Sequence, residues 1–168
     1  MNKTIKGRLK RLINVWAAFI GKTSIGRYFY SQMVNSAMGR TQKVEHQGAS
    51  LMFSIPNELN KFRVDTFSVK EPETLEWIDC IPRGSVVWDI GANVGLYTCY
   101  AAKARDCRVF AFEPSVFNLE LLARNIFLNG VTDHATIVPL PLSDELAFSK
   151  LNMTMWDKGR PLRMPGNK

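Results

Sequence analysis

One short glycine-containing segment constrains the fold of this chain more than any other feature. It reads Asp89-Ile-Gly-Ala-Asn-Val-Gly-Leu-Tyr97 and directly follows the apolar run Val86–Trp88. A second apolar run, Val109–Phe112, ends in Glu113 about one strand–helix–strand unit later. Apolar strands that alternate with amphipathic helices are typical of a parallel sheet with right-handed crossovers. The segment therefore predicts a ligand-binding turn at the carboxyl end of a buried strand.

The patterns around this turn predict an α/β domain with about three core strands. The core strands are expected at Val86–Ile90, Arg108–Phe112 and Ala135–Leu140, with helices over Leu96–Lys103 and Ser115–Asn129 between them. In the second helix we expect Ser115 as the cap, Gly130 as the terminator, and Leu119, Leu122, Ile126 and Phe127 facing inward. Before the sheet, we expect a helix over 2–20, irregular or short helical structure over 21–47, a strand over Ser50–Ile55 and a helix over Pro72–Ile81.

The positive charge of the chain is concentrated at its N-terminus. The net charge is +7, yet no Asp or Glu occurs before Glu45. Nine of the 22 Lys and Arg residues lie in that stretch: Lys3, Lys6, Arg8, Lys10, Arg11, Lys22, Arg27, Arg40 and Lys43. We therefore divide the chain into a basic helical arm (1–47), an α/β domain (48–151) and a disordered tail (152–168). The arm is either a solvated extension or a contact for an anionic membrane or an acidic partner, and nucleic acid is the least favoured partner.

Other features of the sequence favour a cytoplasmic protein without a metal site. The arm has too short an uncharged run to span a bilayer and shows no convincing cleavage site, although residues 2–20 can contact a membrane peripherally. The three cysteines are expected to be reduced and buried. His46 and His134 stand in polar surroundings without metal-ligand spacing, so both are expected at the surface.

The acid before the glycine turn indicates which ligand the turn accepts. A dinucleotide would place a pyrophosphate over the turn, where Asp89 repels it; two unit charges ~4 Å apart in a partly shielded site interact by about 4 kcal/mol. S-adenosyl-L-methionine instead carries a sulfonium and an ammonium, which suit a carboxylate. Gly91 and Gly95 allow close backbone approach, and Glu113 suits the two ribose hydroxyls of either cofactor type. The charge argument therefore favours S-adenosyl-L-methionine as the cofactor.

Three further residues have alternative interpretations. Asn93 is either a turn residue that tolerates left-handed backbone geometry or a polar contact to the methionine end. Ser143 and Asp144 follow the third strand, where they either meet the adenine base or only turn the chain. The sequence leaves both alternatives open.

Four motifs of this chain, in order, resemble the FkbM family of S-adenosylmethionine-dependent methyltransferases. They are Lys70–Asp79, Trp88–Tyr97, Ala111-Phe112-Glu113-Pro114 and Leu142-Ser143-Asp144. The resemblance covers roughly residues 50–150. It implies a class I, Rossmann-like methyltransferase fold and O-methylation of a hydroxyl on a sugar, other glycan or secondary metabolite. It also implies that Asp89, Gly91, Ala92, Asn93 and Gly95 line the methionine side of the cofactor and that Glu113 binds its ribose.

The resemblance ends in the C-terminal part of the chain. The family continues with further strands and an acidic motif that helps to form the acceptor site, whereas residues 152–168 do not resemble that continuation. A truncated or frame-shifted product is therefore expected, with an incomplete sheet and an apolar edge at Val86–Ile90. The catalytic base stays unassigned. The alternative function is a non-catalytic fragment or interaction module whose basic arm binds a membrane or a partner.

Overall fold

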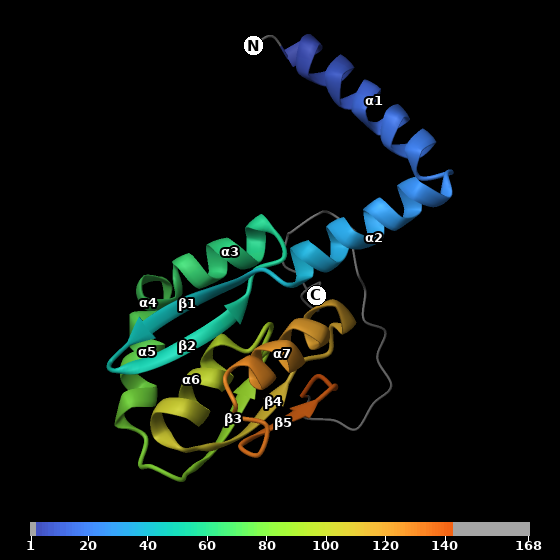
Figure 1. The fold of residues 1–168 in the computed structure, drawn as a ribbon. Helices are drawn as coiled ribbons and strands as arrows, with labels where there is room; N and C mark the ends of the chain where they lie inside the picture. The colour runs from blue at the N-terminus through green and yellow to red at the C-terminus, as the bar shows by residue number, and fades with distance from the viewer. Residues whose placement is uncertain (1–2, 143–168) are drawn as a thin grey trace, which may run out of the picture. The chain divides into compact units, whose positions relative to one another are not determined.

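The structure, a computed structural model, describes residues 3–142, with side chains described at residue 7 and from residue 12 onward (Figure 1). The chain forms two compact units, Met1–Gly39 and Arg40–Lys168. None of the described helices combines the length and the apolar character that a membrane crossing requires. The expected tail at 152–168 and the candidate residue Ser143 lie outside the described residues.

The first unit consists of two helices joined by a tight corner. Helix α1 spans Lys3–Ile20 and α2 spans Ser24–Met38. Thr23 caps α2 by accepting a hydrogen bond from the Gly26 amide at 3.0 Å, and Tyr30 donates to the Ala17 carbonyl. A Cβ at Gly26 would lie 1.9 Å from the Ile20 carbonyl oxygen, so only glycine fits the corner. The expected N-terminal helix is confirmed, but α2 is a full helix where irregular or short helical structure was expected.

The second unit begins with a β-hairpin. Strands β1 (Thr41–His46) and β2 (Ala49–Ser54) pair antiparallel, with Thr41 opposite Ser54. Gln47 and Gly48 form the turn with φ values of 44° and 79°, the left-handed geometry typical of two-residue hairpin turns. The expected strand at 50–55 is confirmed within one residue. Its partner β1 was missed because Val44 is its only aliphatic residue.

Three short helices connect the hairpin to the sheet. They are α3 (Glu58–Asp65), α4 (Phe67–Lys70) and α5 (Pro72–Cys80). The Asn57 side chain caps α3 by accepting from the Asn60 amide at 3.0 Å. Pro72 stands in the first turn of α5, where its missing N–H costs no helical hydrogen bond. The expected helix from Pro72 is therefore confirmed.

A three-stranded parallel sheet follows, in the order β3-β4-β5. Its strands are β3 (Val86–Ile90), β4 (Arg108–Phe112) and β5 (Ala135–Val138), and helices α6 (Leu96–Arg105) and α7 (Val116–Leu128) connect them. The register aligns Ile90 with Phe112 and Phe112 with Val138, so the three strands end together. The expected α/β architecture is confirmed, and the bounds of β3 and β4 match the sequence prediction.

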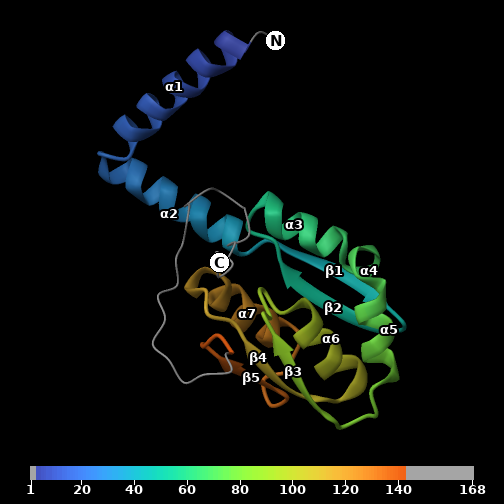
Figure 2. The same cartoon turned by 180° about the vertical axis from the view of Figure 1, so that it is seen from behind.

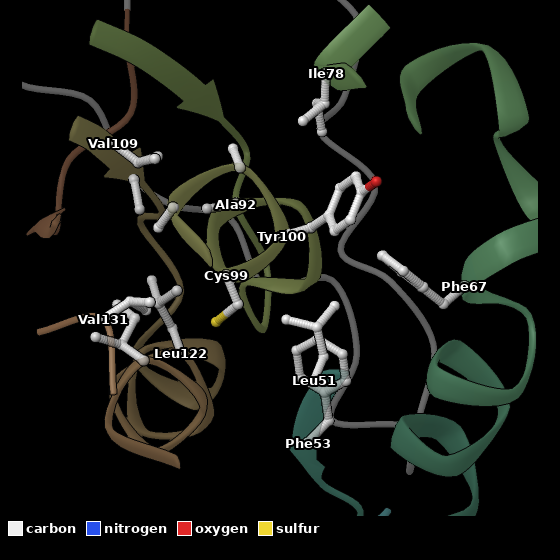
Figure 3. Close-up of a cluster of buried hydrophobic side chains, with 14 of the residues drawn as sticks. Leu51, Phe53, Phe67, Ile78, Ala92, Cys99, Tyr100, Val109, Leu122 and Val131 are labelled. Atoms are coloured by element: carbon white, nitrogen blue, oxygen red, sulfur yellow. The ribbon is translucent and has the colours of Figure 1, made fainter. Parts of the chain in front are cut away.

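Helices α6 and α7 form a middle layer between the hairpin and the sheet, as Figures 1 and 2 both show. Leu51 and Phe53 of β2 point into this layer, toward Cys99 of α6 (Figure 3). Tyr100 and Phe67 pack edge to face, with ring centroids 5.8 Å apart. The largest fully buried hydrophobic side chains are Tyr100, Phe53, Phe67, Leu51, Leu75, Ile78, Leu122 and Val109.

Asn125 of α7 and Asn129, the residue that caps the C-terminus of α7, bind the free edge of β2. The Asn125 amide oxygen accepts from the Ser54 N–H at 2.8 Å, and the Asn129 side chain bonds both the N–H and the carbonyl of Met52, at 2.9 and 2.8 Å. Asn125 is fully buried and also donates to the Val94 carbonyl at 2.7 Å. These asparagines therefore satisfy backbone groups that would otherwise be unpaired, and they connect the hairpin to the glycine turn.

Several expected side-chain positions are wrong. Phe127 is 76% exposed because Asn125 and Asn129 occupy the face of α7 that meets β2. Cys80 is exposed, whereas Cys99 and Cys107 are buried as expected. His46 is not a surface residue: its ring packs against Tyr100, with centroids 5.2 Å apart. Asn125, Asn129 and His46 lie inside the fold because each has a specific partner there. Periodicity alone does not reveal such partners.

Candidate functional site

The glycine turn folds over the end of the neighbouring strand. The amides of Gly91 and Ala92 both donate to the Phe112 carbonyl, at 2.9 and 3.0 Å. Three residues of the turn have positive φ: 80° at Gly91, 55° at Asn93 and 81° at Gly95. The turn therefore depends on residues that tolerate left-handed geometry, and it leads directly into α6.

The two glycines of the turn have different steric surroundings. A Cβ at Gly95 would lie 2.4 Å from Cδ1 of Leu122, so this glycine allows α7 to pack closely against the turn. A Cβ at Gly91 would meet no atom of the described residues within 4 Å. Gly91 therefore leaves open space above the backbone, as close approach of a ligand requires.

Glu113 ties the end of β4 to the turn. Its Oε2 accepts from the Asn93 amide at 2.9 Å, and its Oε1 accepts from the Ser115 amide at 2.7 Å. The residue is only 6% exposed. The expected capping of α7 by the Ser115 hydroxyl is wrong, because Ser115 makes no side-chain cap bond and its backbone amide binds Glu113 instead. Each carboxylate oxygen keeps a second lone pair, so Glu113 can still accept hydrogen bonds from a ligand.

Among the residues that the structure describes, the carboxylate of Asp89 has no cationic partner, since no Lys, Arg or His nitrogen lies within salt-bridge distance of it. Thr98 of α6 donates to Oδ2 of Asp89. Burial raises the pKa of Asp89, the bond from Thr98 opposes this shift, and the nearby charge of Glu113 raises the pKa further. A cation that approached Asp89 would therefore relieve an unfavourable charge.

Asp89 lines a shallow depression at β3 that also includes the aromatic residues Trp77, Trp88 and Tyr97. Burial raises the pKa of the Tyr97 hydroxyl, and the charges of Glu71 and Asp89 add to the shift, so Tyr97 stays protonated at neutral pH. An aromatic ring near a carboxylate, as Tyr97 is near Asp89, favours a positively charged ligand group.

The side chain of Asn93 has one polar atom without a partner among the described residues. Its backbone amide binds Glu113, but its buried side-chain oxygen Oδ1 has no hydrogen-bond partner within the described part of the chain. A buried acceptor of this kind is costly unless a donor reaches it. The observation fits a donor group on a ligand over the turn.

Sequence reasoning missed two residues of this site. Thr98 lies in the first turn of α6, and its hydrogen bond to Asp89 depends on the orientation of α6 against β3. Arg63 lies on α3, where burial lowers the pKa of its guanidinium and the charge of Glu113 raises it. Arg63 donates to the Asn60 side chain at 3.0 Å and brings a positive charge near Glu113. No residue pattern predicts either contact. Arg63 stands far from the turn along the chain, and the contact of Thr98 with Asp89 depends on how α6 packs.

The structure brings together Asp89, Gly91, Ala92, Asn93, Gly95 and Glu113, at the carboxyl ends of β3 and β4. Ser143 and Asp144 lie outside the described residues. Within residues 3–142, no cluster of His, Cys, Asp and Glu side chains could hold a metal ion. His46 lies near Asp79, with Nε2 3.9 Å from Oδ2, and His134 lies near Asp106, with Nδ1 3.5 Å from Oδ1.

Several solved structures share part of this fold. A SAM-dependent methyltransferase from Agrobacterium tumefaciens matches 60% of this chain and 32% of its own length, at 14% identity and a TM-score of 0.45. TYW2 from M. jannaschii in complex with AdoMet matches 60% and 43%, at 20% identity and 0.44. TYW2 from P. horikoshii in complex with MeSAdo matches 60% and 36%, at 17% identity and 0.43.

The chain spans between about a third and two fifths of the length of these three structures. No protein-family profile matches the sequence, and no curated protein matches it.

Proposed function

We propose that the α/β unit binds S-adenosyl-L-methionine and is the cofactor-binding part of an FkbM-type methyltransferase. The transfer is proposed to be O-methylation of a hydroxyl on a sugar or a secondary metabolite. The observation that carries the proposal is Asp89, a half-buried carboxylate with no cationic partner among the described residues, placed at the start of an open glycine turn. The FkbM family, the hydroxyl acceptor and the cofactor roles of individual residues come from the sequence motifs.

The charge of the site favours a sulfonium cofactor over a dinucleotide. Asp89 and Glu113 are close enough for the charge of Glu113 to raise the pKa of Asp89. A pyrophosphate would add further negative charge to this place, at a cost of roughly 4 kcal/mol for each unit pair ~4 Å apart. A sulfonium and an ammonium would instead compensate Asp89, with the ring of Tyr97 nearby.

The residues of the turn have distinct proposed roles. Asp89 attracts the cationic methionine end, and Gly91 and Ala92 let that end approach the backbone. Asn93 offers its free Oδ1 to a donor on the cofactor. Gly95 holds the turn against α7, so that the first N–H groups of α6 face the methionine carboxylate.

Glu113 is proposed to bind the ribose hydroxyls while it holds Asn93 and Ser115 in place. Ser143 is proposed to lie beside the adenine base. Because the carboxyl ends of β3 and β4 meet at the turn, one extended ligand can reach both carboxylates.

When bound, S-adenosyl-L-methionine supplies an electrophilic methyl group. The contribution of this chain is to bind and orient the cofactor, since in-line transfer depends chiefly on alignment of the reacting atoms. A hydroxyl acceptor also needs a base for its proton, and no described residue of the turn is assigned that role.

Calorimetry with the intact chain tests the proposal. We expect S-adenosyl-L-methionine and S-adenosyl-L-homocysteine to bind, and NAD⁺ to bind more weakly than either. Asp89→Asn should weaken the sulfonium ligand by about tenfold or more and the neutral thioether product by less, because only the former carries the extra cation. Asp133→Asn, which alters an exposed Asp away from the turn, serves as the matched control. A folded protein that binds NAD⁺ as well as S-adenosyl-L-methionine, or binds neither, contradicts the proposal.

A further inference from the structure

We infer that helices α1 and α2 (residues 3–38), here called the helical arm, form a docking element for an anionic lipid surface. It would lie in the headgroup region with the apolar side chains of α1 inserted between the lipids. The inference concerns the first unit alone and does not depend on the cofactor proposed for the second unit.

The charge of the arm is uniform in sign. Of the 22 Lys and Arg residues in the chain, seven precede Arg40, and no Asp or Glu accompanies them. Five of the seven stand within α1 and two follow it: Lys3, Lys6, Arg8, Lys10 and Arg11, then Lys22 and Arg27. Each such charge near an anionic bilayer contributes about 1 kcal/mol of attraction.

Helix α1 also exposes large apolar side chains. Leu12, Trp16 and Phe19 follow the helical spacing of one stripe and are 58, 60 and 66% exposed. Exposed Trp and Phe in a helix that also carries basic residues are typical of helices that lie in the lipid interface. The basic residues gather in the first half of α1 and the exposed aromatic ones in its second half, so α1 offers both kinds of lipid contact.

Helix α2 extends the apolar surface of the arm. Ile25, Phe29 and Met33 are spaced one helical turn apart and are 84, 55 and 56% exposed. The hydrogen bond from Tyr30 to Ala17 and the close contact of Gly26 with Ile20 connect the two helices. The arm therefore acts as one element with exposed apolar residues on both helices.

Charge complementarity favours lipid over the other occupants of this surface. The 15 Lys and Arg residues that remain from Arg40 onward equal the 15 Asp and Glu residues of the chain, so the second unit offers no excess negative charge. A second copy of the arm carries the same seven positive charges and is repelled. A nucleic acid would bind the charges, but it would leave the exposed aliphatic side chains in water.

Vesicle co-sedimentation of the intact chain tests the inference. Vesicles of phosphatidylcholine with about 30% phosphatidylserine should bind at least about tenfold more protein than pure phosphatidylcholine. The difference should largely disappear in roughly 0.5 M NaCl because the attraction is screened. Equal binding to both vesicles, or binding to neither by a folded protein, overturns the inference.

A matched pair of substitutions shows which surface is responsible. Phe19→Glu in α1 should reduce binding to the anionic vesicles by about tenfold or more, whereas Phe62→Glu in α3 should leave it unchanged. The two phenylalanines are similarly exposed, at 66 and 58%. An equal loss for both variants overturns the inference. So does a change of oligomeric state in Phe19→Glu, measured by sedimentation velocity, with no loss of vesicle binding.

Discussion

The two faces of the three-stranded sheet differ sharply, although they alternate along the same strands. On one face, Val87, Val109 and Ala111 are buried beneath α6 and α7. On the other, Val86, Trp88 and Ile90 of β3 are 52, 59 and 65% exposed, and among the described residues β3 pairs only with β4. Parallel sheets are normally covered on both faces. The covered face therefore supports the glycine turn, while the other face has the composition of a surface that packs against a further layer.

The largest effect is expected from an added side chain on the covered side of the sheet, at Gly95. Gly95→Ala should lower the free energy of unfolding by about 3 kcal/mol or more, because the new Cβ clashes with Leu122 at a φ of 81°. Gly91→Ala should cost only about 1 kcal/mol, since its surroundings are open and only the backbone strain remains. Urea denaturation of both variants checks this; equal losses would show that Leu122 does not limit Gly95.

The asparagine contacts between α7 and the hairpin should have the next largest effect. Asn125→Ala removes the partners of the Ser54 amide and the Val94 carbonyl, so we expect a loss of about 2–4 kcal/mol. Asn118→Ala, in the first turn of the same helix, should change stability by less than about 0.5 kcal/mol. Thermal denaturation of the two variants measures the difference. A loss below 1 kcal/mol in Asn125→Ala, on the scale of a surface substitution, would contradict this account.

Substitutions at two adjacent valines of β3, one on each face of the sheet, should have different effects on stability. Val87→Ala, on the covered face, should cost about 2 kcal/mol, whereas Val86→Ala should cost less than about 0.5 kcal/mol. The two side chains are 8 and 52% exposed on the same strand. If both substitutions destabilise the protein equally in urea denaturation, the outer face of β3 is covered in solution.

The smallest expected effect concerns Asp89 and pH. Burial raises the pKa of Asp89 in the folded state above its unfolded value, so the unfolded state ionises first as pH rises. Folding stability contributed by this group is therefore complete below the unfolded pKa and is lost as pH rises through the folded pKa. Asp89→Asn should be more stable than the wild type at neutral pH, and the advantage should vanish in acid. An advantage that does not change with pH would contradict the assignment.

The sequence predicts the sheet better than it predicts the surrounding layers. Strands β3 and β4 were predicted to the residue, because their apolar runs end at the glycine turn and at Glu113. Strand β1 was missed since its residues are mostly polar, and its position follows from pairing with β2 rather than from its own pattern. The inward placement of Phe127 was wrong for a related reason: the edge of β2 requires hydrogen-bonding side chains, which Asn125 and Asn129 supply.

In the candidate site, too, the sequence predicted the residues but not their contacts with one another. The sequence grouped Asp89, the turn and Glu113, because the ends of adjacent parallel strands meet at one edge. It did not predict that Glu113 binds the amides of Asn93 and Ser115, nor that Thr98 donates to Asp89. These contacts depend on side-chain direction and on the packing of α6, neither of which a residue pattern specifies.

We propose that the glycine turn at the carboxyl ends of β3 and β4 binds a cationic adenosyl ligand. The most direct measurement is a titration of the ¹⁵N-labelled intact chain with S-adenosyl-L-methionine, followed by amide resonances. We predict the largest shifts at Gly91, Ala92 and Asn93, smaller ones at Ser115 through Glu113, and strongly reduced shifts in Asp89→Asn. Largest shifts in α1 and α2, or shifts at the turn that Asp89→Asn leaves unchanged, would contradict the account.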